Sequence, residues 1–263
     1  MTSKQFTDQM GRLITISFPP KRIISLVPSQ TELLFELELD QEIIGMTKFC
    51  IHPQDKFKTK PKVGGTKKLN MKMIRELKPD LIIGNKEENE QSQIEELMNE
   101  FPVWMSDINE LADAVGMITG IGKLTGRFQQ AELISFKILE GFNMLNQSAK
   151  SNQTVAYFIW KDPFMVAGRN TFIHDILNKA GYENFTKQDR YPVMSMDEIK
   201  KSNPDLVFLS SEPYPFKDVH VVELKSILPS AKVMVVDGEM FSWYGSRLLQ
   251  SPAYLQKLAD LTN

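Results

Sequence analysis

A proline-free stretch over residues 125–150 constrains the fold more than any other part of the chain. Its large apolar residues recur every three or four positions, at Phe128, Leu133, Phe136, Leu139, Phe142 and Leu145. This spacing is the period of an amphipathic helix, and Thr125 is a residue type that caps helix N-termini. A helix of this length spans about 35 Å, the size of a small domain. We expect a rigid helix that joins two lobes; the alternative is one more layer helix on a single sheet.

Both flanks of this stretch alternate between strand and helix patterns. Short apolar runs, the kind buried in parallel sheets, predict strands over residues 23–27, 43–46, 81–83, 103–105, 154–160, 206–209 and 233–236. Helical patterns predict helices over residues 71–77, 91–100, 111–123, 171–180 and 196–201. Residues 6–16 have the pattern of a hairpin. Ser29 and Glu32 have capping-box spacing at the start of a further helix.

One short motif occurs twice. Residues 74–81 and 199–206 share Ile, Pro, Asp and Leu at a constant offset of 125 residues, and each copy has the pattern of a helix, a proline stop and an apolar strand. The same offset relates Glu87 to Glu212, each in the loop after its strand. A repeat this long is not a solenoid unit. It predicts two lobes of similar build, with chance similarity of one β/α unit as the alternative.

The predicted fold class is α/β, with two Rossmann-like lobes that have central, mostly parallel sheets and are bridged by one long helix. We expect residues 1–20 to form an N-terminal β-hairpin and 21–110 an N-terminal α/β lobe. Residues 111–150 would contain helices, including the bridge, and 151–263 a C-terminal α/β lobe.

Composition excludes several classes of protein. Lys plus Arg number 31 and Asp plus Glu 33, so the basic excess of a nucleic-acid-binding surface is missing. The single cysteine, Cys50, excludes an intrachain disulfide. The N-terminus lacks a signal-peptide pattern, and no run of about 18 apolar residues predicts a membrane helix. As written, the chain is expected in the cytoplasm; if it is exported, its signal has been removed.

The loops after the predicted strands are the candidate ligand site, because ligands of open α/β sheets bind at the carboxyl ends of strands. These loops cover residues 28–29, 49–52, 84–88, 160–164, 211–216 and 241–247. They are rich in aromatic residues, which suits a large, partly apolar ligand in a cleft between the lobes. Trp160 and Trp243 are expected at this cleft, whereas Trp104 lies within a strand and is expected in the core.

Catalytic and metal-binding motifs are absent from the sequence. It contains neither a Gly-rich phosphate loop nor a Gly-x-Ser-x-Gly nucleophile motif. His52, His174 and His220 lie in different segments, and none belongs to a zinc-type pair, so direct metal binding is not expected. His52 is a candidate ligand contact and His174 is not. Asp80 and Asp205 precede strands, at the wrong end for a site, and are expected to be structural.

The motifs over residues 22–32, 77–83 and 203–206, in this order, resemble those of the helical-backbone substrate-binding proteins of ABC importers, of the cobalamin- and ferric-siderophore-binding type. The resemblance covers nearly the whole chain. It implies little hinge motion, a monomer without catalysis, and a small-molecule metal chelate bound between the lobes. The ligand would be a corrinoid or an iron–siderophore complex, with no covalently bound cofactor and no nucleic acid.

The resemblance also assigns roles to residues. Phe49, Phe164, Trp243 and Arg247 match pocket residues of the cobalamin binder, whereas two of its pocket tryptophans correspond here to Thr66 and Asn85. Together with the loop positions, the predicted ligand-binding set is Pro28, Phe49, His52, Asn85, Glu87, Trp160, Phe164, Trp243, Tyr244 and Arg247.

Two further positions concern docking and location. Where the family has a permease-docking glutamate on each lobe, this chain has Lys72 and Asp197. A lysine would repel the arginines expected on a permease. The family role implies a periplasmic or cell-envelope location. The alternatives are a cytoplasmic carrier or sensor of the same ligand, and an enzyme that uses Glu87 and Glu212 as paired carboxylates.

Overall fold

The computed structural model describes residues 2–148 and 152–262. The chain divides into two compact units. The first unit comprises Met1–Ile108, Ala112–Phe136 and Tyr244–Arg247, and the second comprises Asn109–Leu111, Lys137–Trp243 and Leu248–Asn263. The division falls within one long helix, α6 (Phe128–Ser148). The segment Tyr244–Arg247 thus belongs to the first unit, although the sequence placed it in the C-terminal lobe.

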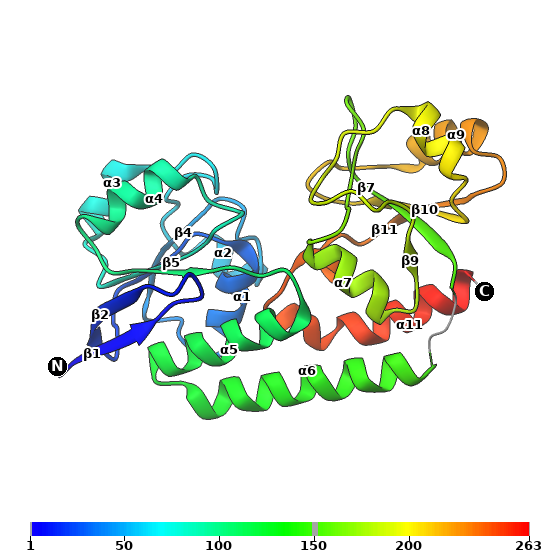
Figure 1. The fold of residues 1–263 in the computed structure, drawn as a ribbon. Coiled ribbons are helices and arrows are strands. Elements are labelled where there is room, and N and C mark those ends of the chain that lie inside the picture. Colours follow the sequence, from blue (N-terminus) through cyan, green and yellow to red (C-terminus); the bar gives the residue numbers. More distant parts are fainter. Residues whose placement is uncertain (1, 149–151, 263) are drawn as a thin grey trace. The chain divides into compact units, whose positions relative to one another are not determined.

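The first unit contains a parallel sheet and a hairpin (Figure 1). The sheet has the order β4-β3-β5-β6, and all its neighbours run parallel. Its strands are buried along almost their whole length, as continuous apolar runs require. The strands are β1 (Thr2–Thr7) and β2 (Leu13–Phe18) of the hairpin, and β3 (Ile23–Ser25), β4 (Ile43–Met46), β5 (Leu81–Asn85) and β6 (Val103–Ser106) of the sheet.

Helices cover both faces of the first sheet. Figure 1 shows α3 and α4 on one face and α1 and α5 on the other. The chain passes from β3 to β4 in one direction along the sheet and from β4 to β5 and β6 in the other, so right-handed crossovers place α1 and the pair α3 and α4 on opposite faces. The helices of this unit are α1 (Pro28–Glu36), α2 (Gln54–Phe57), α3 (Met71–Leu77), α4 (Gln91–Met98) and α5 (Leu111–Thr125).

The second unit is built around a mixed sheet of five strands in the order β11-β10-β7-β8, with β9 also paired to β7. Strands β7, β9, β10 and β11 run parallel and β8 runs antiparallel. The strands are β7 (Thr154–Trp160), β8 (Met165–Val166), β9 (Glu183–Asn184), β10 (Leu206–Ser210) and β11 (Lys232–Val236). The helices are α7 (Phe172–Lys179), α8 (Met196–Ser202), α9 (Asp218–Ile227), α10 (Glu239–Ser242) and α11 (Ser251–Thr262).

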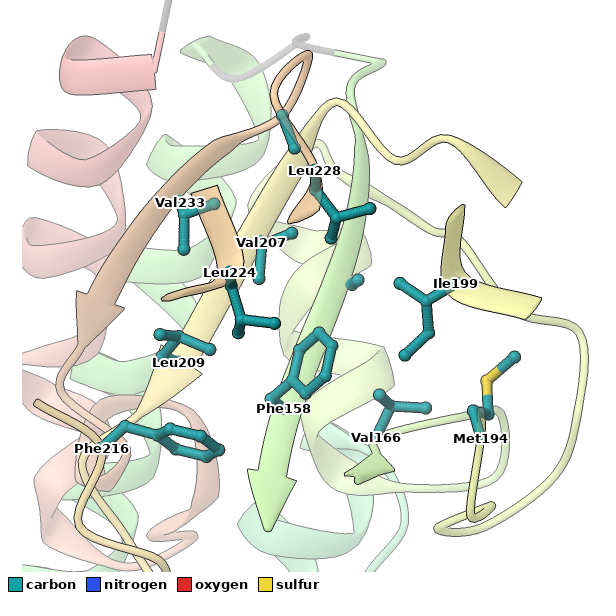
Figure 2. Packing of buried hydrophobic residues seen from close by; sticks show 12 residues of the cluster. Phe158, Val166, Met194, Ile199, Val207, Leu209, Phe216, Leu224, Leu228 and Val233 are labelled. Atoms are coloured by element: carbon teal, nitrogen blue, oxygen red, sulfur yellow. The ribbon is translucent and has the colours of Figure 1, made fainter. Parts of the chain in front are cut away.

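Alternate residues of the second sheet pack on opposite faces, as the pleat of a strand requires. One face carries Phe158, Val207 and Leu209, which pack with Ile199 of α8 and Leu224 of α9 in one buried cluster (Figure 2). On the other face, the rings of Tyr157 and Phe208 contact Phe241, with centroids 5.0 and 6.2 Å away. The sheet is therefore covered on both faces, which leaves its carboxyl edge for loops.

The long helix differs from its sequence prediction in its start and its buried face. Thr125 does not cap α6; it ends α5, and its hydroxyl donates to the carbonyl of Ile121. Of the six apolar residues that defined the stripe, only Phe142 and Leu145 are buried, because Ala131, Ile134 and Ile138 complete the inward face instead. The expected end at Lys150 lies outside the described residues.

The predicted capping box at Ser29 and Glu32 is wrong. Helix α1 begins two residues earlier than a capping box at Ser29 would place it, with Pro28 at its first position and Val27 as an N-cap without a side-chain bond. Proline fits this position because the first N–H groups of a helix have no intrahelical acceptor. A capping box does occur at α8, where Ser195 and Glu198 bond reciprocally.

Candidate functional site

The carboxyl edge of the first sheet is organised by two asparagines. Asn85 is buried; its Oδ1 accepts the backbone N–H groups of Glu87 and Glu88 at 2.8 and 3.0 Å, and its Nδ2 donates to Ser106 Oγ at 2.9 Å. Asn89 Oδ1 accepts the N–H of Asn85 at 2.9 Å. Asn85, predicted as a ligand residue, thus uses its polar atoms to shape the loop that carries half-buried Glu87.

An aromatic ring is exposed beside this loop. Phe49 follows strand β4 and is 49% exposed. A Cβ on Gly65 would lie 3.1 Å from its ring, so the glycine allows the loop to approach the ring closely. His52 and Pro28, also predicted as ligand residues, are half-buried at the same edge. Beneath them, Cys50 is fully buried against the hydroxyls of Thr31 and Thr47, and burial raises the pKa of its thiol.

Arg247 is engaged by the protein itself. Its guanidinium donates to both carboxylate oxygens of Glu32 on α1, at 2.6 and 3.1 Å. Its neighbour Gly245 packs against Ser29, where a Cβ would lie 2.2 Å from the Ser29 carbonyl oxygen. Tyr244 is buried in the same segment. The sequence placed Arg247 in the predicted ligand-binding set, and here a bidentate bond to Glu32 fastens its segment to α1.

The second unit presents a different aromatic group at its carboxyl edge. Trp160, the last residue of β7, is 40% exposed, and its ring meets that of Tyr214 edge-on at 5.6 Å. Tyr214 in turn packs on Phe216 and His220. His220 Nδ1 accepts the backbone N–H of Lys217 at 2.9 Å, so the ring is fixed in place. Sequence reasoning placed 211–216 at the site but did not connect His220 with it.

Phe164 and Trp243 lie deeper than predicted. Phe164 meets Phe158 edge-on at 5.5 Å and packs against the buried cluster of Figure 2. Trp243 is buried, and its indole N–H donates to Glu212 Oε1 at 2.8 Å. The Ser242 hydroxyl donates to the same oxygen at 2.9 Å. Both rings lie beneath the edge loops, so Trp160 is the more exposed aromatic side chain that this edge offers to a ligand.

Burial raises the pKa of the Glu212 carboxyl, and the nearby carboxylates of Glu239 and Asp237 add to this rise. The hydrogen bonds from Ser242 and Trp243 act in the opposite direction. The sequence marked Glu212 by its position in the repeat, opposite Glu87, and in the loop over residues 211–216. Its partnership with Trp243 could not be inferred, because the two residues lie 31 positions apart in different loops.

The two predicted docking positions are exposed on corresponding helices. Lys72 lies on α3, with its ammonium 3.9 Å from Glu76, and Asp197 lies in the first turn of α8. They are the second residues of these two helices. Each is therefore accessible to a partner on the surface of its own unit.

Neither a metal centre nor a membrane span was found within residues 2–148 and 152–262. No three His, Cys, Asp or Glu side chains gather there as a metal ion would require. In the same residues, no helix combines the length and hydropathy needed to cross a bilayer.

Comparison with known proteins identifies the relatives of this fold. A family model described as periplasmic binding protein matches residues 23–226. The vitamin B12-binding protein of Pectobacterium carotovorum subsp. carotovorum (strain PC1) is 22% identical over 237 residues, which cover 88% of this chain and 85% of that protein. An uncharacterized ABC transporter substrate-binding lipoprotein of Bacillus subtilis (strain 168), YvrC, is 25% identical over 269 residues, covering 96% of this chain and 83% of that protein.

Solved structures share the fold at low identity. The periplasmic vitamin B12-binding protein BtuF of Vibrio cholerae superposes with a TM-score of 0.80 and 19% identity, over 94% of this chain and 99% of that one. The periplasmic heme-binding protein RhuT of Roseiflexus sp. RS-1 in its apo form also gives a TM-score of 0.80 at 19% identity, over 92% and 97% of the two chains. The two-lobed α/β architecture predicted from the sequence is confirmed.

Proposed function

The chain belongs to the periplasmic binding protein family, and from this premise we propose that it is the substrate-binding protein of an ABC importer for a metal chelate. The candidate ligands are corrinoids, ferric siderophores and hemes, since relatives in this family are named for vitamin B12 or heme. The observation that carries the proposal is an exposed aromatic ring at the carboxyl edge of each sheet, Phe49 in one unit and Trp160 in the other. Such rings suit the broad, partly apolar faces of these chelates.

We propose ligand contacts in the carboxyl-edge loops of each unit. Phe49 and Trp160 make the direct contacts, together with Pro28, His52 and Glu87 in the first unit. The deeper residues, Asn85, Phe164, Trp243, Tyr244 and Arg247, support these loops. This division follows from the bonds in which the deeper residues already take part, such as Trp243 with Glu212 and Arg247 with Glu32.

The test is a titration of the purified protein with hemin, cyanocobalamin and ferric siderophores, in which tryptophan fluorescence and calorimetry measure binding. If Phe49 and Trp160 are anchors, Phe49→Ala and Trp160→Ala should each reduce the binding free energy of the chelate by about 2 kcal/mol. Phe136→Ala is the control, because Phe136 is also an exposed aromatic residue but lies on α6 and not in a loop that follows a strand. The proposal fails if no chelate of the panel binds, or if the edge variants and the control bind it equally well.

Importer function also requires a permease, and this part of the proposal is tested at the docking positions. Lys72→Glu should strengthen association with a cobalamin-type permease at low salt, because it removes a like charge facing arginine. Asp197→Lys should not strengthen it. If wild type and both variants associate equally, Lys72 and Asp197 are not the interface. If the protein binds a chelate but no permease, the carrier or sensor function is favoured.

We propose a cell-envelope location for the native protein, in line with relatives named as periplasmic or as lipoproteins. Fractionation of the native host, with immunodetection of this protein in cytosolic and envelope fractions, tests this. Exclusive recovery from the cytosol would contradict it.

A further inference from the structure

The loops between β4 and α3 carry a concentration of positive charge. Residues 48–68 contain seven lysines and one carboxylate, Asp55, in a chain whose net charge is −2. Lys56 and Lys60 form ion pairs with Asp40 at 2.5 and 2.8 Å. The ion pairs of this segment therefore neutralise only part of its charge.

Three other lysines of this segment, Lys48, Lys67 and Lys68, are exposed at the carboxyl edge of the first sheet. Backbone hydrogen bonds hold the two loops that carry them together. The N–H of Lys48 donates to the carbonyl of Gly64 at 2.8 Å, and Gly65 and Lys68 exchange N–H···O bonds of 2.8 and 3.3 Å. The positive charge is thus built into a defined pair of loops.

The ammonium group of Lys48 lies beside the exposed aromatic ring of this edge, and that of Lys67 lies against the loop after β5. Lys48 Nζ is 5.0 Å from the centroid of Phe49, within the range of a cation–π contact. Lys67 Nζ donates to the carbonyl oxygen of Glu87 at 2.6 Å, which ties it to the loop organised by Asn85. A lysine ammonium has three N–H donors, so donors remain for a second acceptor at this position.

We infer that this edge selects chelates that carry negative charge, with carboxylate or catecholate groups accepting from Lys48 and Lys67 while an apolar part of the chelate lies on Phe49. Lys68 adds to the field of these two groups. The inference rests on the proposed function and narrows its ligand class. Charge-assisted bonds would stabilise an anionic chelate. A corrinoid with no net charge would desolvate the same ammonium groups with weaker electrostatic compensation.

The experiment compares four chelates of graded charge at low and high salt: cationic ferrioxamine B, neutral cyanocobalamin, hemin with its two propionates, and anionic ferric enterobactin. Hemin and ferric enterobactin are expected to bind most tightly, and their affinity should fall as the salt concentration rises. Lys48→Met and Lys67→Met should each weaken the anionic chelate that binds best by about 2- to 5-fold, the size of one exposed charge pair. Neither variant should weaken a neutral chelate.

Lys225→Met is the matched control, because Lys225 is an exposed lysine on α9 of the second unit and its loss changes the net charge equally. The inference is overturned if cyanocobalamin or ferrioxamine B binds best, or if all three lysine variants weaken the anionic chelate equally. The proposed function survives both of these results. The proposed function itself is contradicted only if no chelate binds, or if Phe49→Ala and Trp160→Ala bind the chelate as well as Phe136→Ala does.

Discussion

The segment α3–β5 of the first unit matches the segment α8–β10 of the second, 125 residues further along the chain. Each helix and each strand begins and ends at equivalent positions of the repeat. Their ends also match. Asn70 and Ser195 cap the two helices, each accepting the N–H three residues on, at 3.1 and 3.3 Å. Lys78 and Asn203 end them in the same left-handed conformation, with φ 46° and 44°.

The aspartates of the two segments also perform the same task. Asp80 accepts the backbone N–H groups of Lys21 and Arg22, both at 2.8 Å, just ahead of β3. Asp205 accepts the N–H and hydroxyl of Thr154, both at 2.8 Å, at the start of β7. Each aspartate therefore ties its strand to the neighbouring strand at the amino edge, and both are structural, as the sequence predicted.

The similarity ends where the two strands end. Glu87 sits in a loop shaped by Asn85, with lysines on the neighbouring loops, whereas Glu212 holds Trp243 among the carboxylates of Asp237 and Glu239. The repeated framework is thus shared, but the charged and aromatic groups of the two edges differ. We therefore expect ligand selection to depend on the edge loops and stability to depend on the repeated framework.

The largest expected effect tests whether equivalent positions of the two segments contribute equally to the free energy of unfolding. Ile74 and Ile199 are equivalent positions and both are fully buried. Ile74→Ala and Ile199→Ala should each reduce the free energy of unfolding by about 2–5 kcal/mol through lost burial and a residual cavity. Urea denaturation followed by circular dichroism measures both. If one variant costs less than about 1 kcal/mol, the two helices are not energetically equivalent.

A smaller effect is expected at the aspartates. Asp80→Ala and Asp205→Ala should each cost about 1–2 kcal/mol, because backbone donors lose their acceptor while water compensates in part. Hydrogen bonds from Thr154 lower the pKa of Asp205 below its ordinary value. Its contribution is therefore present above the unfolded pKa of about 4 and lost as the pH falls through the lower folded value. An Asp205→Ala penalty that is the same at pH 7 and at about pH 2 would contradict this prediction.

The same substitution should have different effects on stability at the C-caps of the two helices. Lysine tolerates the left-handed region less well than asparagine. Lys78→Gly should therefore stabilise the protein by about 0.5–1 kcal/mol, and Asn203→Gly by a few tenths at most. Thermal unfolding of both variants at one pH gives the comparison. A larger gain from Asn203→Gly would show that side-chain contacts outweigh backbone conformation at this cap.

The smallest effect concerns the pair of glutamates that distinguishes the edges. Since burial raises the pKa of Glu212, its favourable contribution is present below the unfolded pKa and is lost as the pH rises through the folded value. Glu212→Gln keeps an oxygen for Trp243 and Ser242 and should raise Tm at pH 7 by about 1–2 °C, with a smaller gain at about pH 4. Glu87→Gln, at the equivalent position, is the control. A loss of stability at pH 7 would show that Trp243 requires the charged acceptor.

Much of the framework could be predicted because its signals are local. The bounds of α3, β4 and β7 were predicted as observed, since apolar runs, prolines and caps act within a few residues. Helix α9 was missed, and so were the short strands β8 and β9. Two-residue strands contain too few positions for alternation to show.

The sequence predicted which loops form the candidate site, but not which of their side chains are exposed. The carboxyl-edge rule brought Phe49 and Trp160 to the expected edges of their units. It could not distinguish them from Phe164 or Trp243, which follow strands equally well but are held inward by Phe158 and Glu212. An aromatic residue has the same sequence signal whether its ring lies on a loop or beneath it.

The sequence by itself therefore determined the fold class, the two related units and the long helix, because periodicity and capping act over neighbouring residues. Tertiary structure decided which face of α6 is buried, because the predicted stripe and the observed one are both compatible with a helical period. It also decided the partners of the buried charges. Glu32 and Arg247 meet across 215 positions of the chain, and only packing between distant segments brings such groups within hydrogen-bond distance.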